Sequence, residues 1–252
     1  MTEPILRTEN LRKAYGALKV TDNVDLDLMP DELHAIIGPN GAGKTTLIHQ
    51  LSGRLPADGG RVLFEGDDIS SLSMARRAQL GIARTFQITS LLPGFSALEN
   101  AALAVQARSG SSFRFFQAAA HERALNDEAM AALETVGLAG RADRPAGTLS
   151  HGEQRQLELA IALATRPRLL LLDEPLAGTG REESERLTDL ILGLKRKLAV
   201  MMIEHDMDAV FALADRVSVL VYGRIIKTGT PAEVRADPEV RAAYLGDEVA
   251  RC

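Results

Sequence analysis

Apolar and polar residues alternate in short stretches over residues 5–36, and turn-forming residues interrupt them at Tyr15-Gly16 and at Met29-Pro30-Asp31. A period of two is typical of half-buried strands, so we expect strands on both sides of these turns. They lead to a mostly apolar stretch, Leu33–Ile37, that predicts a buried strand. A helix is then expected from Lys44 to Ser52.

The character of the sequence changes near Leu98, because the residues from there to about Val136 are rich in alanine and poor in β-branched side chains. This composition favours helices, so we expect a mostly helical insert. Strand and helix patterns alternate again after the insert, which predicts βαβ units and a largely parallel sheet. Further strands and helices are expected at residues 61–65, 169–172, 182–198, 199–203, 209–214 and 217–221.

Composition and charge narrow the function classes. Hydrophobic residues make up 46% and charged residues 25% of the 252 residues, which is typical of a globular protein with a large core. The net charge of −5 gives no reason to expect binding to nucleic acid or to anionic membranes. The single cysteine, Cys252, excludes a disulfide within the chain, and the N-terminus resembles no signal peptide, so we expect a soluble intracellular protein.

A phosphate-binding motif lies between the predicted strand at 33–37 and the helix after it. The segment Gly38-Pro-Asn-Gly-Ala-Gly-Lys-Thr45 fits G-x-x-x-x-G-K-[ST] without a gap. Its glycines allow backbone N–H groups to surround a phosphate, and the helix adds its positive end. Lys44 is expected to reach the β- and γ-phosphates, and the Thr45 hydroxyl to coordinate Mg²⁺. The expected nucleotide-binding residues of this motif are Gly38, Pro39, Asn40, Gly41, Ala42, Gly43, Lys44, Thr45 and Thr46.

Two adjacent carboxylates follow the run of four leucines at Leu169–Leu172. Such a run predicts a parallel strand buried on both faces, and ligands bind at the carboxyl ends of such strands. Apolar strands that end in acids are common, but after a phosphate-binding loop they favour a catalytic role. Asp173 is then expected to hold Mg²⁺, and Glu174 to orient and deprotonate an attacking water.

A third motif lies in Thr148-Leu-Ser-His-Gly-Glu-Gln154. Ser150 and Glu153 have the S-x-x-E spacing of a capping box, so we expect Glu153 to fold back onto the backbone N–H of Ser150. Apolar residues follow at helical spacing. The stretch is either an ordinary capped helix or a helix whose start also binds a ligand.

The order of these motifs resembles that of the ATP-binding cassette (ABC) ATPases. The resemblance runs from Leu6 to about Gly246, and five motifs in the family's order are far more specific than any one of them. The usual signature of the family is LSGGQ. In Leu149-Ser-His-Gly-Glu153 two residues depart from it, because His151 replaces a glycine and Glu153 replaces the glutamine.

The resemblance implies an α/β fold with a P-loop NTPase core around a mainly parallel sheet. It also implies an N-terminal antiparallel β subdomain and an inserted α-helical subdomain. We expect residues 1–252 to form a single ABC ATPase domain. Within it, residues 88–155 are expected to form the helical subdomain, and residues 1–87 and 156–252 the RecA-like catalytic core with the β subdomain.

The resemblance further implies roles for single residues. Tyr15 is similar to the aromatic residue that stacks on adenine, although a tyrosine can also pack in a strand turn. Gln87 resembles the residue that joins the metal and the water to the helical subdomain. His205 resembles the switch histidine that contacts the γ-phosphate and supports Glu174. The implied catalytic residues are Lys44, Gln87, Glu174 and His205, and the implied Mg²⁺ ligands are Thr45, Gln87 and Asp173.

The cluster Glu204-His205-Asp206 could suggest a separate metal site. We do not expect one, because adjacent residues on a strand point to opposite faces.

In the family, two cassettes pair head to tail, and each ATP lies between one P-loop and the signature helix of the partner. The resemblance therefore implies that Ser150, His151, Gly152 and Glu153 act on the partner's ATP. ATP binding would close the dimer, and hydrolysis would reopen it. Gly180 stands where many relatives carry an aspartate, so communication through that carboxylate is not assumed here.

Finer features are similar to the ATPases of branched-chain amino acid importers. They include Arg84-Thr-Phe-Gln-Ile88, Glu204-His-Asp-Met207 and the ending Gly229-Thr-Pro-Ala-Glu-Val234. The insert around Phe113-Arg-Phe-Phe116 also resembles that group, and we expect its aromatics to pack in the core of the insert rather than to contact a partner. Urea importers and the lipopolysaccharide-export ATPase are the nearest alternatives.

This resemblance implies ATP and Mg²⁺ as ligands and places the chain at the cytoplasmic face of the inner (plasma) membrane. The implied partners are a second ABC ATPase subunit, identical or related, and two membrane permease subunits. A periplasmic substrate-binding protein would be an indirect partner, and no nucleic acid is expected. Alternatives of another class are a small-molecule kinase and a soluble, DNA-associated ABC ATPase.

Overall fold

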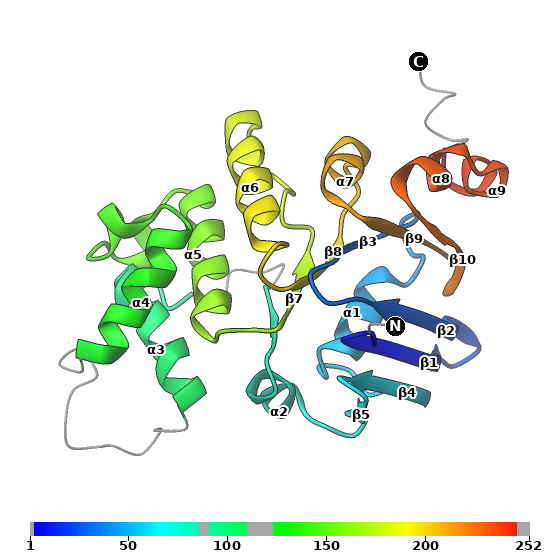
Figure 1. The fold of residues 1–252 in the computed structure, drawn as a ribbon, viewed down its shortest axis with the longest axis horizontal. Helices are drawn as coiled ribbons and strands as arrows, with labels where there is room; N and C mark the ends of the chain where they lie inside the picture. Colours follow the sequence, from blue (N-terminus) through cyan, green and yellow to red (C-terminus); the bar gives the residue numbers. More distant parts are fainter. Residues whose placement is uncertain (1–2, 86–90, 110–122, 246–252) are drawn as a thin grey trace.

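The computed structural model describes residues 3–85, 91–109 and 123–245 of the chain. Two β-sheets form one part of the molecule, and a group of three helices lies at its other end (Figure 1). The predicted aromatic stretch Phe113-Arg-Phe-Phe116 and the predicted Gln87 both lie outside the described residues. No helix in the described ranges is long and apolar enough to cross a membrane.

The N-terminal sheet is antiparallel and has the strand order β2-β1-β4-β5. Its strands are β1 (Leu6–Tyr15), β2 (Leu18–Leu28), β4 (Gly59–Phe64) and β5 (Asp67–Asp68). Buried positions alternate with exposed ones along much of β1 and β2, as expected for a sheet with one solvated face. The sequence therefore predicted β1, β2 and the turn between them correctly and β4 to within two residues, whereas the two-residue β5 was not predicted.

The central sheet has the order β10-β9-β3-β8-β7-β6, and only β10 is antiparallel to its neighbour. Its strands are β3 (Leu33–Ile37), β6 (Ile82–Arg84), β7 (Leu169–Asp173), β8 (Ala199–Ile203), β9 (Arg216–Val221) and β10 (Arg224–Gly229). Every residue of β3, β7 and β8 is buried, which explains their nearly continuous apolar sequences. The parallel order confirms the predicted βαβ pattern.

Each face of the central sheet has its own core. On one face, Leu47 and Ile48 of α1 (Lys44–Leu51) lie in one apolar cluster with residues of the N-terminal sheet. On the other face, α5 (His151–Ala164), α6 (Arg181–Leu194) and α7 (Met207–Leu213) contribute to a second cluster. The sheet is thus covered on both sides, and α1 is held between the two sheets. α6 ends four residues before the predicted Leu198, because the chain turns at Lys195–Leu198.

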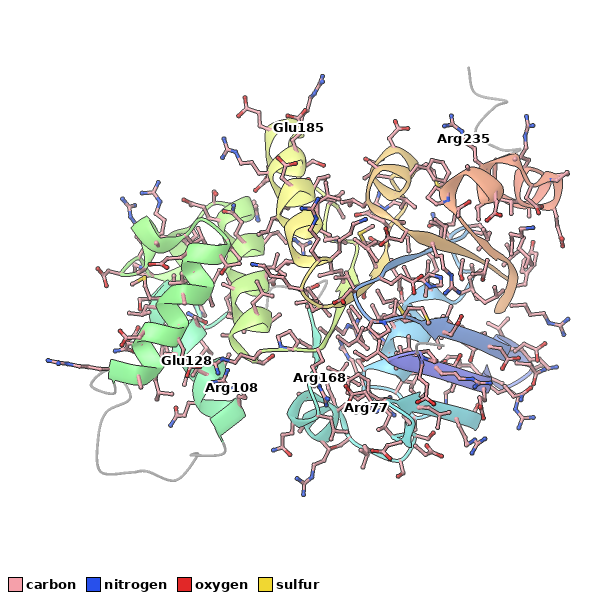
Figure 2. The ribbon with its side chains drawn as sticks, viewed as in Figure 1. Arg77, Arg108, Glu128, Arg168, Glu185 and Arg235 are labelled. Carbon is pink, nitrogen blue, oxygen red and sulfur yellow. The ribbon has the colours of Figure 1, made fainter. Side chains whose placement is uncertain are left out.

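The three-helix group consists of α3 (Ala97–Ser109), α4 (Arg123–Thr135) and α5, which contact one another. An ion pair between Arg108 and Glu128 joins α3 to α4 (Figure 2). This group agrees with the predicted helical insert. The expected boundary at residue 155 falls inside α5, so the division at that residue stays a prediction.

The remaining short helices lie at the edges of the two sheets. α2 (Met74–Gln79) precedes β6, and α8 (Pro231–Ala236) and α9 (Pro238–Val240) follow β10. Arg77 of α2 is buried and donates to the carbonyls of Gln50 and Leu51 at the end of α1, at 2.8 Å each. Burial lowers the pKa of Arg77 to about 10. Its guanidinium therefore caps the carboxyl end of α1 and fixes α2 beside it.

Candidate functional site

The predicted phosphate-binding loop connects β3 to α1, as the motif requires. Gly43 has φ +107°, in the region that favours glycine, and a Cβ there would lie 2.2 Å from the carbonyl oxygen of Val20. A Cβ on Gly38 would lie 2.0 Å from the carbonyl oxygen of Leu220. β2 and β9 therefore enclose the loop tightly, and only glycine fits at these two positions. The other predicted residues Pro39, Asn40, Gly41 and Ala42 complete the loop, and Thr45 and Thr46 lie in the first turn of α1.

Lys44 lies inside this loop and is largely buried. Its Nζ donates to the carbonyl oxygens of Gly38 at 2.7 Å and Pro39 at 3.1 Å. Burial lowers the pKa of Lys44, and the carboxylates of Glu174 and Asp173 act in the opposite direction. The ammonium group and the two predicted acids therefore share one site.

Asp173 is the last residue of β7 and is 1% exposed. Its Oδ2 accepts a hydrogen bond from Arg84 Nη2 at 2.7 Å, and the two side chains form a buried ion pair. Its Oδ1 is buried and has no hydrogen-bond partner among the described residues. Thr45 is exposed at the start of α1. A carboxylate and a hydroxyl oxygen are hard ligands, so these residues fit a Mg²⁺ ion.

Glu174 follows directly and has φ +50°, a left-handed conformation that is unfavourable for glutamate. Its backbone N–H donates to the carbonyl oxygen of Ile203 at 2.9 Å, which fixes it to the end of β8. Strained backbone of this kind often occurs at functional sites, where the surrounding structure holds a side chain in place. The geometry agrees with a carboxylate presented at the edge of the sheet.

The predicted signature forms the start of α5. Ser150 caps the helix, with Glu153 N donating to Ser150 Oγ at 3.2 Å and Ser150 N donating to Glu153 Oε2 at 2.9 Å. This confirms the predicted capping box. Arg141 Nε also donates to Glu153 Oε1 at 2.8 Å. The backbone hydrogen bond from Ser150 and the contact with Arg141 hold the pKa of Glu153 below its usual value.

The two unusual signature positions are both accommodated. His151 is the first helical residue and does not have a positive φ, so the helix start needs no glycine there. Glu153 accepts from the N-cap backbone and from Arg141, so its charge is paired at the helix start. Gly152 is buried, and the carboxylate of Glu183 lies where its Cβ would be.

Comparison with known proteins decides between an ordinary capped helix and a family signature. The family model described as ABC transporter matches residues 21–177, which include the phosphate-binding loop, the capped helix and the Asp173-Glu174 pair. The chain belongs to the ABC transporter family. It is an ATPase of the ATP-binding cassette type.

Close relatives match this ABC ATPase over nearly its whole length. The high-affinity branched-chain amino acid transport ATP-binding protein LivG of Escherichia coli strain K12 is 36% identical, over 98% of this chain and 100% of its own. BraF of Pseudomonas aeruginosa, which has the same description, is 37% identical over the same shares. A second family model, branched-chain amino acid ATP-binding cassette transporter, matches residues 224–250.

Solved cassettes confirm the ABC ATPase fold. A nucleotide-free ATP-binding cassette from an ABC transporter has a TM-score of 0.86 and 34% identity, covering 96% of this chain and 98% of its own. The ADP conformation of the cassette MJ1267 has the same TM-score at 35% identity, covering 97% and 100%. The predicted α/β fold class is thus confirmed.

The predicted base-stacking residue of this ABC ATPase lies at the end of β1. The Tyr15 ring is 54% exposed, and Lys13 Nζ lies 5.8 Å from its centroid. An exposed ring can stack on a base, whereas a ring packed in the turn could not. Its role stays a prediction.

The structure corrects the reasoning about Glu204-His205-Asp206. These residues do not lie on a strand, because β8 ends at Ile203 and the chain continues as a loop. Glu204 is fully buried, whereas the His205 side chain is 60% exposed. No group of three metal-ligating side chains occurs within the described ranges.

Sequence reasoning missed two side chains that touch the site. Arg84 was read only as part of a family motif, and its partner Asp173 is 89 residues away. Glu204 was considered only as a possible metal ligand. Both contacts join segments that are distant in sequence, so no local pattern could reveal them.

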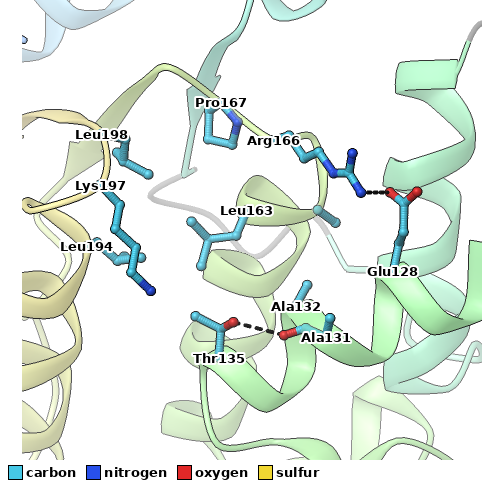
Figure 3. Close-up of a pocket in the computed structure, with 11 residues that line it drawn as sticks. Glu128, Ala131, Ala132, Thr135, Leu163, Arg166, Pro167, Leu194, Lys197 and Leu198 are labelled. Atoms are coloured by element: carbon cyan, nitrogen blue, oxygen red, sulfur yellow. Dashed lines mark hydrogen bonds and ion pairs between the residues drawn. The ribbon is translucent and has the colours of Figure 1, made fainter.

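The hollows that lie outside the phosphate-binding loop include a groove and a cavity. A groove of about 270 Å³ lies between α2, β6 and α5, and its wall is mainly apolar; it includes Met74, Ala78, Leu91, Ile161 and Ala162. A cavity of about 290 Å³ lies between α4, the end of α5 and the end of α6, where Arg166 pairs with Glu128 at 3.2 Å (Figure 3). None of the predicted site residues lines either hollow.

Proposed function

We propose that this chain powers the import of branched-chain or related amino acids across the inner (plasma) membrane. The observation that carries the proposal is the match of residues 224–250 to the branched-chain amino acid cassette model. The phosphate loop and the capped helix are shared by ABC ATPases of many kinds, whereas this C-terminal segment separates one group from the rest. The full-length similarity to LivG and BraF supports the same group.

The residues of the site support these roles in ATP hydrolysis. The backbone of the phosphate loop and Lys44 bind the phosphates, and Tyr15 contacts the base. Thr45, Asp173 and Gln87 would hold Mg²⁺, which would neutralise phosphate charge when bound. Glu174 accepts the proton of the attacking water, and His205 contacts the γ-phosphate.

The start of α5 supports action on the ATP of a second cassette, identical or related. Ser150, His151 and Gly152 place a hydroxyl and backbone N–H groups at the positive end of a 14-residue helix. Such an end attracts phosphate. Glu153 also lies at this end, and its ion pair with Arg141 offsets the charge that it brings there.

Two membrane permease subunits are the further partners that this proposal requires, with a periplasmic binding protein that delivers the cargo to them. The apolar groove between α2 and α5 supports docking of a permease, because it lies between the catalytic sheet and the helical group. We infer that the chain lies at the cytoplasmic face of the membrane, bound to these permeases.

Uptake of radiolabelled amino acids tests the proposal. The gene is deleted in its host and restored either as wild type or as Lys44→Ala. Uptake of leucine, isoleucine and valine is expected to fall in the deletion, to return with wild type, and to stay low with Lys44→Ala. Glucose uptake is the control and is expected to stay constant. Normal uptake of all three amino acids in the deletion strain would refute import of branched-chain amino acids.

A second candidate is lipopolysaccharide export. The lipopolysaccharide export system ATP-binding protein LptB of Haemophilus influenzae is 33% identical over 97% of this chain and 98% of its own. Loss of surface lipopolysaccharide with unchanged leucine uptake in the same deletion strain would favour it. Labelled urea in the same assay tests the urea-importer alternative.

A further inference from the structure

Glu204 is a buried carboxylate that two loops of the site use as a common acceptor. Its side chain is 0% exposed. Oε1 accepts a hydrogen bond from the backbone N–H of Leu176 at 2.9 Å. Oε2 accepts from the backbone N–H of His205 at 2.7 Å and of Asp206 at 3.3 Å. One side chain therefore satisfies three buried or half-buried backbone donors.

These donors belong to the two segments that carry the predicted base and the predicted switch histidine. Leu176 lies two residues after Glu174, in the loop that follows β7. Glu174 itself donates from its backbone to Ile203, the residue before Glu204. The two loops are thus joined both by a backbone hydrogen bond and by the Glu204 carboxylate.

Glu204 also contacts the imidazole of His205. Nδ1 of His205 lies 3.3 Å from Glu204 Oε2. A carboxylate at this distance favours the tautomer with its proton on Nδ1, which leaves Nε2 as the nitrogen for a ligand. The carboxylate therefore influences both the position of the His205 backbone and the orientation of its ring.

We propose that Glu204 is a positioning residue that holds the Glu174 loop and the His205 loop in one arrangement for ATP hydrolysis. This inference rests on the proposed function, because it assumes that Glu174 and His205 act in turnover. Glu204 acts through these two residues and does not itself contact ATP.

The chemistry of the position requires a carboxylate of this length. A glutamine has nearly the same shape, but its NH₂ group cannot accept from a backbone N–H, so it satisfies one loop and repels the other. An aspartate is one methylene shorter and cannot reach both loops from the same backbone position. An apolar residue leaves all three donors without an acceptor.

Amide hydrogen exchange of Glu204→Gln tests the joining of the two loops directly. Protection is expected to fall in at least one of the two loops, at Leu176 or at His205 and Asp206, while the amides of β3 stay unchanged. Unchanged protection of these three amides in the folded variant would overturn the proposal. This readout does not depend on ATP hydrolysis, so it separates failure of the inference from failure of the proposed function.

Steady-state kinetics and ATP titration test the consequence for turnover. Because a misplacement of about 1 Å can reduce turnover by about 10²-fold, kcat of Glu204→Gln is expected to fall by roughly that factor, with unchanged affinity for ATP. The matched control is Glu32→Gln, since Glu32 is a buried carboxylate that accepts from Met29 N at 2.6 Å, before β3. Its kcat is expected to remain at the wild-type value. Equal losses in both variants, or wild-type kcat in Glu204→Gln, would overturn the proposal.

A double variant separates positioning from a general loss of stability. In a His205→Ala background, Glu204→Gln is expected to reduce kcat by much less than in the wild type, because one of the residues it positions is gone. If kcat of the double variant falls by the product of the two single-variant factors, Glu204 does not act through His205. If Glu204→Gln does not fold, Glu204→Asp replaces it in both backgrounds. In the chain that retains His205, Glu204→Asp is expected to lose kcat by roughly the same factor, and wild-type kcat there would contradict the proposal.

Discussion

Replacing Arg84 by methionine is expected to destabilise the fold far more than the loss of an ordinary ion pair. Arg84 and Asp173 lie 2.7 Å apart, and their side chains are only 5% and 1% exposed. Removing one partner leaves the other charge buried without compensation, which costs about 3–5 kcal/mol. Methionine keeps the apolar contacts of the arginine stem. The decrease in the free energy of unfolding therefore reflects mainly the Asp173 charge that has lost its ion-pair partner.

The desolvation of Arg84 in the wild type places the expected loss near the lower end of that range, at about 3 kcal/mol. Burial lowers the pKa of Arg84, which shows that the charged guanidinium is itself unfavourably desolvated in the wild type. Methionine removes this cost. Arg84 Nη1 also donates to Ser52 Oγ at 3.2 Å, and loss of this long hydrogen bond adds only a small amount.

Urea denaturation followed by circular dichroism measures the change in the free energy of unfolding. The control is Arg181→Met, because Arg181 and Glu185 form an ion pair at 3.2 Å with side chains 93% and 66% exposed. It is expected to cost less than about 0.5 kcal/mol. In an Asp173→Asn background, Arg84→Met is expected to cost little or to stabilise, since the ion pair with Asp173 is already lost there.

The reasoning would be refuted by a loss below about 1 kcal/mol for Arg84→Met, within the range of exposed ion pairs. An equal loss in the Asp173→Asn background would refute it as well. In that case the stem of Arg84, and not its charge, would be what stabilises the end of β7.

Three further results are expected. Burial lowers the pKa of His34 to about 4, from about 6.5 in the unfolded chain. Between these pH values the unfolded chain binds more protons than the folded chain, so the free energy of unfolding falls as pH falls. From pH 7 to pH 5 this loss is expected to be about 2 kcal/mol, measured as the difference in urea unfolding between wild type and His34→Gln. His151→Gly is expected to retain substantial ATPase activity. Gly152→Asp is expected to abolish it, because the new carboxylate would meet Glu183 at the helix start. ATPase activity in Gly152→Asp would contradict this account. Glu174→Gln is expected to slow ATP turnover by at least about 10²-fold and to favour an ATP-bound dimer in gel filtration, and unchanged turnover would mean that another group accepts the proton.

Local patterns in the sequence sufficed wherever one segment determines its own structure. The alternation of residues 5–36, the leucines of β7 and the S-x-x-E spacing of Ser150 and Glu153 each specify a nearby geometry, and each was found as predicted. The resemblance to the ABC ATPases predicted the order of the subdomains along the chain.

What the sequence could not predict depends on contacts between distant segments. The pairing of Arg84 with Asp173 and the three hydrogen bonds accepted by Glu204 arise only when the sheet is assembled. The strand rule failed at Glu204-His205-Asp206 because β8 ends at Ile203, before all three of these residues. The contact of Arg141 with Glu153 was missed for a similar reason, since a turn brings them together.

The left-handed backbone of Glu174 places stability and catalysis in opposition at one position. Glycine adopts φ +50° without strain, so Glu174→Gly is expected to relieve roughly 1 kcal/mol while removing the carboxylate. Random mutagenesis selected only for thermal stability would therefore tend to favour inactive chains at this site. Glutamate at this position lowers stability, so only selection for ATP turnover would retain it.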